Sequence, residues 1–100
     1  MDFLKDLGLT DDVIYQMKIN NNQAVLFNLI CARNFVKDNI DYFNSIGIDV
    51  VDLLLIYRPE IFINDPALVK KAFEGYELNK IVELINNDIN AINLLWLILF

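Results

Sequence analysis

The residues able to do chemistry are few in this chain of 100 residues. There is no His, which excludes every mechanism that needs an imidazole base or ligand. The nucleophile candidates are Ser45, Thr10 and Cys31, one residue of each type, and none can be paired with a His. A Cys-based zinc site would need several thiolates. We therefore predict that the protein is not an enzyme and has no catalytic, cofactor-binding or metal-binding residues.

Cys31 has Phe27 and Phe35 four residues to either side. A reactive thiolate needs a nearby positive charge and access to solvent. Arg33 is close in sequence but points elsewhere on a helix, so we expect Cys31 to be a buried structural residue. A single Cys also excludes an internal disulfide framework, and this indicates a reducing compartment.

Paired carboxylates offer a second candidate chemistry, because two of them on one helix face can share a cation. The pairs are Asp11/Asp12, Asp38/Asp41, Asp49/Asp52 and Glu74/Glu77. Several of these residues suit helix caps, the others suit solvated faces, and no calcium-binding loop motif occurs. No metal site is expected.

The basic residues bear on nucleic-acid binding, which draws its affinity from neutralised phosphates. The basic cluster consists of Arg58, Lys70, Lys71 and Lys80. The whole chain has eight basic and 14 acidic residues, for a net charge of −6. Solvated helix faces explain the cluster better than a nucleic-acid site does.

An unbroken apolar run of seven residues closes the sequence, at residues 94–100. A transmembrane helix needs about 20 such residues, so this run does not predict a membrane span. A helix that is apolar on every side must be buried, yet in a small domain only one of its sides can face the core. We therefore expect either an interaction or self-association surface here, or the cut end of a longer array. The expected interaction residues are Leu94, Trp96, Leu97 and Phe100.

The elements that would position these residues are helical. Apolar residues recur at steps of three and four, which is one face of an α-helix over residues 24–46. They are Val25, Leu29, Ala32, Val36, Ile40 and Phe43. The stripe predicts that Val36 and Phe43 lie in the core.

Capping residues place further helices. Thr10 is predicted to cap one helix, Asp49 a second, and Asp65 a third with Pro66 at its first position. Pro59 ends the helix that Asp49 begins. No stretch alternates at period two over a useful length, so we predict an all-α fold without a sheet.

Three Gly-centred triplets punctuate the chain: Leu7-Gly8-Leu9, Ile46-Gly47-Ile48 and Glu74-Gly75-Tyr76. Their spacing of 28 to 39 residues is typical of stacked helical repeats. The sequence thus predicts a small helical-repeat-like, solenoid-type bundle of five to seven helices. Residues 1–100 would form a single domain or a fragment of a longer repeat array.

Residues 39–48, followed by a short helix and then by Tyr57-Arg58-Pro59-Glu60-Ile61-Phe62, resemble the helical repeat of the mitochondrial transcription termination factor family. In the first copy, which covers residues 2–28, Asn21 or Asn22 stands where that repeat has Pro. The resemblance implies an α-solenoid that binds nucleic acid.

Residues 66–91 are also similar to an ankyrin repeat, with residues 67–75 as its inner helix and residues 80–91 as its outer helix and loop. The usual Thr-Pro-Leu-His start is missing, and Asn87-Asp88 lacks the usual Gly. An ankyrin repeat would imply protein binding.

These observations favour a non-enzymatic macromolecular-interaction module that binds another protein, or itself, through the C-terminal apolar segment. The alternative is a nucleic-acid-binding helical repeat module. A mostly acidic surface would favour protein, and a continuous basic groove would favour nucleic acid. No membrane association and a cytoplasmic location are expected, because Asp2, Lys5 and Asp6 interrupt any secretory signal.

Overall fold

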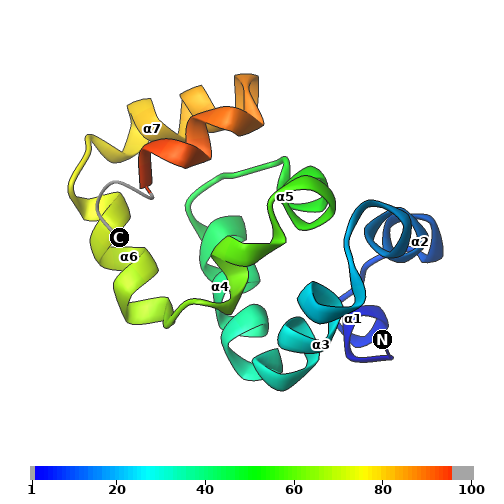
Figure 1. Cartoon of the computed structure of the whole chain (residues 1–100). Coiled ribbons are helices and arrows are strands. Elements are labelled where there is room, and N and C mark those ends of the chain that lie inside the picture. Colours follow the sequence, from blue (N-terminus) through cyan, green and yellow to red (C-terminus); the bar gives the residue numbers. More distant parts are fainter. Residues whose placement is uncertain (1, 96–100) are drawn as a thin grey trace.

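The computed structural model describes residues 2–95, and these residues form an all-α structure without strands. The α-helices are α1 (Asp2–Asp6), α2 (Asp11–Asn20), α3 (Gln23–Cys31), α4 (Arg33–Ser45), α5 (Val51–Tyr57), α6 (Pro66–Glu74) and α7 (Leu78–Asn87). The 3₁₀ helices are η1 (Pro59–Ile63) and η2 (Ile89–Ile92). The chain runs from α1 and α2 at one end to α6 and α7 at the other (Figure 1). The predicted fold class is confirmed.

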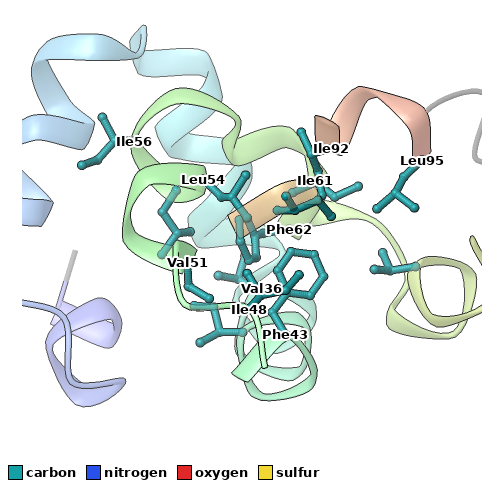
Figure 2. Packing of buried hydrophobic residues seen from close by; sticks show 14 of the residues in the cluster. Val36, Phe43, Ile48, Val51, Leu54, Ile56, Ile61, Phe62, Ile92 and Leu95 are labelled. Atoms are coloured by element: carbon teal, nitrogen blue, oxygen red, sulfur yellow. The ribbon is translucent and has the colours of Figure 1, made fainter. Parts of the chain in front are cut away.

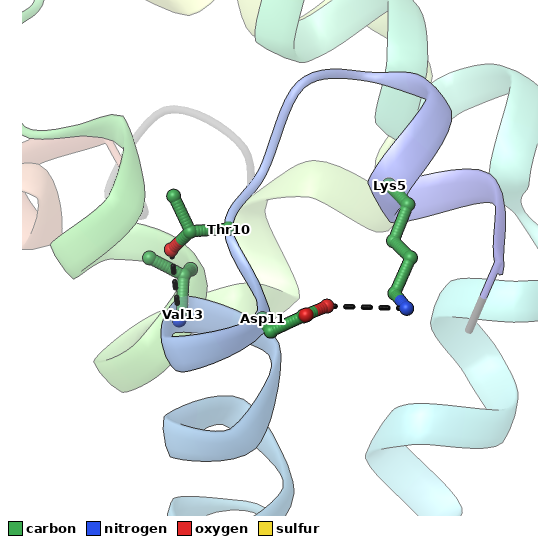
Figure 3. Close-up of polar contacts among 4 residues, drawn as sticks. All are labelled: Lys5, Thr10, Asp11 and Val13. Atoms are coloured by element: carbon green, nitrogen blue, oxygen red, sulfur yellow. Dashed lines mark hydrogen bonds and ion pairs between the residues drawn. The ribbon is translucent and has the colours of Figure 1, made fainter.

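Two of the three predicted caps are confirmed. The Val13 N–H donates to Thr10 Oγ1 at 3.2 Å at the start of α2, and Asp11 there also lies 3.1 Å from Lys5 Nζ (Figure 3). The Ala67 N–H donates to Asp65 Oδ1 at 2.9 Å at the start of α6. The cap predicted at Asp49 is wrong, because α5 begins after Val50 without a side-chain cap. The Asp49 N–H donates instead to Asn86 Oδ1 of α7.

The single helix predicted over residues 24–46 is wrong, because it is divided at Ala32 into α3 and α4. Ala32 has φ −99° and ψ 24°, outside the helical values. Helices α3 and α4 both pack against η1, and the bend allows each to do so along its own direction. The apolar stripe continues across the bend, with Leu29, Val36, Ile40 and Phe43 buried.

The first two Gly triplets form the same turn. Gly8 has φ +88° and Gly47 has φ +93°, the left-handed region that favours glycine. In both turns the residue after Gly donates its N–H to a carbonyl five residues back, Leu9 to Leu4 and Ile48 to Phe43. This is the Schellman arrangement. Gly75 differs, because its φ is −70° and α6 ends there without a left-handed residue. The repeat is thus present in two copies, at Gly8 and Gly47.

Three asparagine side chains tie helices that are distant in sequence. Asn21 Nδ2 donates to Ile56 O, at the junction of α2 and α5, at 2.9 Å. Asn39 Nδ2 donates to Phe62 O and Asn64 O, at 2.9 Å each. Asn86 Nδ2 donates to Gly47 O at 3.0 Å, so α7 holds the second Schellman turn.

The core contains a cluster of aromatic rings from α4, η1 and α6. The Phe43 ring lies 5.0 Å from the Phe62 ring and 5.3 Å from the Phe73 ring, measured between centroids. All three side chains are fully buried. Figure 2 shows Phe43 and Phe62 with Val36 between the helices, as the stripe predicts.

Replacing Phe43 with Ala should lower the free energy of unfolding by about 3–5 kcal/mol, the usual cost of truncating a large core side chain. Phe27→Ala is the matched control, because Phe27 is 64% exposed. Its effect should stay near the roughly 0.5 kcal/mol of a surface change. Urea denaturation followed by circular dichroism measures both. Equal losses in the two variants would show that the stripe does not face the core.

The Schellman turns predict an asymmetry among the glycines. Gly8→Ala and Gly47→Ala should each destabilise by about 1–2 kcal/mol, because an L side chain is strained in the left-handed region. No atom lies within 4 Å of a Cβ at Gly8, so the cost there is backbone strain alone. Gly75→Ala should not destabilise, because Gly75 is already right-handed. Thermal denaturation tests this, and a loss at Gly75 as large as at Gly8 would refute it.

Candidate interaction surface

The C-terminal apolar segment, predicted as the interaction surface, lies mostly outside the described residues. This applies to Trp96, Leu97 and Phe100. Leu94 is described and is 38% exposed, and its carbonyl accepts a hydrogen bond from the Tyr76 hydroxyl at 2.9 Å. Its neighbour Leu95 is fully buried and belongs to the main core (Figure 2). The described part of the run is therefore anchored to the fold and exposes Leu94 only in part.

A larger exposed apolar surface lies on α3 and the first turn of α4. It consists of Phe27, Ile30, Cys31 and Phe35, which we call the α3 patch. Phe27, at 64%, is the most exposed large apolar side chain among the described residues, and Ile30 and Phe35 are 39% and 42% exposed. Phe27 and Cys31 are four residues apart, so they share one face of α3. Single exposed apolar residues are normal, but a group of this kind marks an interaction site.

A groove of about 450 Å³ lies beside the α3 patch. We call it the α3–α4 groove, and its lining residues are Asn28, Cys31, Ala32, Asn34, Phe35 and Ile63. Its walls come from the end of α3, the start of α4 and the end of η1, so it exists because the helix bends at Ala32. The lining is apolar with two asparagine amides, and it carries no ionisable group other than the Cys31 thiol.

The expectation that Cys31 is buried is wrong, because its side chain is exposed on the α3 patch. The sequence places Cys31 one residue from the buried stripe, and periodicity alone does not give the width of the buried face. In the structure, the core covers the face of α3 that carries Leu29 and leaves the neighbouring face, with Phe27 and Cys31, uncovered.

Helix α3 differs from the other α-helices of the described chain in having no charged residue. The uncharged stretch extends from Ile19 to Ala32. Depletion of charge with enrichment of aromatic residues is the compositional mark of an interface core. A solvated helix face would normally carry Lys or Glu instead.

The cations suspected of forming a basic cluster have local partners. Lys80 Nζ lies 3.4 Å from Glu77 Oε2, and Arg58 donates to Asn90 Oδ1 at 2.6 Å. Lys70 and Lys71 are exposed neighbours on α6. These contacts engage half of the cluster away from an incoming phosphate.

The remaining candidate sites can be located in the part of the chain that the structure describes. Within residues 2–95, no group of three His, Cys, Asp or Glu side chains is arranged to hold a metal ion. None of the helices in this range combines the length and hydropathy that a membrane crossing requires.

Comparison with known proteins gives no match, whether against family models, curated proteins or solved structures.

The exposure of Cys31 predicts a simple chemical result. In dilute native protein, the thiol should react with a disulfide reagent such as Ellman's reagent at a rate close to that in denaturant, because access does not require unfolding. Absorbance of the released thiolate measures the rate. Reaction only after addition of denaturant would place Cys31 in the core and remove the α3 patch.

Proposed function

We propose that this chain is a non-enzymatic protein-binding module whose contact surface is the α3 patch with the α3–α4 groove. The observation that carries the proposal is the exposure of Phe27, Ile30 and Phe35 on a helix face without charge. Leaving such side chains in water forfeits roughly 1.5–3 kcal/mol for each one that a partner could fully bury. Binding recovers part of this free energy.

The shape of the surface also supports protein binding. Hot spots are enriched in aromatic residues next to well-packed pockets. The α3 patch offers Phe27 as a protruding aromatic group and the α3–α4 groove as a concave site within one helical turn of it. The exposed lone thiol of Cys31 suits a reducing compartment such as the cytoplasm.

The nucleic-acid alternative has less support from the charges. The chain has a net charge of −6, and Lys5, Lys37 and Lys80 each lie within 4 Å of a carboxylate. A phosphate-binding surface draws its affinity from cations that are free to neutralise phosphates. The resemblance to the transcription termination factor repeat therefore supports a helical repeat more than it supports that family's activity.

A photoreactive side chain tests the proposal directly. Benzoylphenylalanine in place of Phe27 should form covalent adducts with protein when irradiated in cells that encode this chain. The same residue in place of Tyr15 is the matched control, because Tyr15 is a 59% exposed aromatic residue on α2, next to charged residues. Gel mobility and mass spectrometry identify the adducts.

The outcomes separate the candidate surfaces. Protein adducts from Phe27 but not from Tyr15 would support the α3 patch. Adducts from position 100 but not from position 27 would keep protein binding and return the contact to the C-terminal segment. Adducts with nucleic acid from both positions would contradict the proposal.

A further inference from the structure

The charge pattern of the α3 patch indicates what kind of protein can cover it. We infer that a second copy of this chain covers the patch, in a two-fold pair with the two α3 helices antiparallel. This inference rests on the protein-binding function proposed above. In a two-fold interface each residue faces the same surface that carries it, so like charges near the axis repel. A chain with a net charge of −6 can pair in this way at low electrostatic cost only through a charge-free face.

Helix α3 provides such a face, and the other exposed apolar groups do not. On α2, Tyr15 and Ile19 share the helix with Asp11, Asp12 and Lys18. On α5, Leu53 and Tyr57 share the helix with Asp52. On α7, Leu78 and Leu84 share the helix with Lys80 and Glu83. A symmetric contact at any of these would bring like charges together.

The patch is also complementary to itself in shape. Phe27 protrudes, and the groove opens beside Cys31, four residues further along the same helix face. Four residues correspond to about 6 Å along the helix axis. In an antiparallel pair centred near Leu29, Phe27 of each copy would lie over the Cys31 side of the other copy's groove. A groove of about 450 Å³ has room for a phenyl ring.

The size of the contact predicts a weak pair. Helix α3 has nine residues and is therefore about 13 Å long. Such a contact is small beside the roughly 800 Å² that each partner buries in a standard stable interface. We expect a reversible monomer–dimer equilibrium that is resolved in the micromolar range or above.

Two measurements on the full chain test the pairing. Sedimentation velocity over a concentration series should show a rising dimer fraction. A short bis-maleimide should link Cys31 of one copy to Cys31 of another, with a yield that rises with concentration, because both thiols lie near the axis. The rate of the thiol reaction described above should fall as the dimer forms.

The variants use exposed positions so that the fold is retained, as circular dichroism would verify. Phe27→Lys should abolish both the dimer and the cross-link. Asn28→Asp is a second variant of nearly unchanged shape that places a carboxylate in the groove, and it should weaken the dimer at least tenfold at low salt and less at high salt. Tyr15→Lys is the matched control and should leave the dimer unchanged.

Three results would overturn the inference. A dimer that survives Phe27→Lys would be formed elsewhere. A monomer at every concentration, with protein adducts from position 27 in cells, would exclude self-pairing and leave the proposed function intact. A monomer without such adducts would overturn both.

Discussion

The side-chain amide of Asn39 connects the central helix to the segment on which the other helices pack. Its Nδ2 donates to Phe62 O and Asn64 O, which fixes the end of η1 against α4 in a fully buried site. Helices α3, α4 and α5 all pack on η1, so their relative positions depend on this anchor. Ile63, between the two acceptors, lines the α3–α4 groove. The same buried amide therefore helps to shape both the core and the candidate site.

The sequence predicted the helical class, the caps at Thr10 and Asp65 and the buried face of α4, because these depend on residues within one or two turns of each other. It did not predict the bend at Ala32, because no Gly or Pro marks it and its cause is packing of both helices on η1. The exposure of Cys31 follows from that bend and from what the core leaves uncovered. A face without charge from Ile19 to Ala32 was the available sequence signal for the candidate site.

The asparagines show the same limit from another side. Asn21 and Asn86 are readily interpreted as residues that end helices, since Asn favours caps and turns. Both do lie at or near helix ends, but their amides also bind carbonyls of other helices. An amide carries donors and an acceptor, so it can satisfy a distant carbonyl at a helix end where that carbonyl lacks a partner. Which carbonyl it reaches depends on the tertiary arrangement.

These amide ties have a consequence for the kinetics of folding. They close chain separations of 35 residues at Asn21 and 39 residues at Asn86, whereas α6 and α7 pack against each other as neighbours in sequence. Local helices form in microseconds or less, before loops of this length are held closed by native contacts. The ties would then form after the main barrier, so that they slow unfolding more than they speed folding. In this chain the asparagines would set the lifetime of the native state, while the apolar stripe of α4 would set how quickly it is reached.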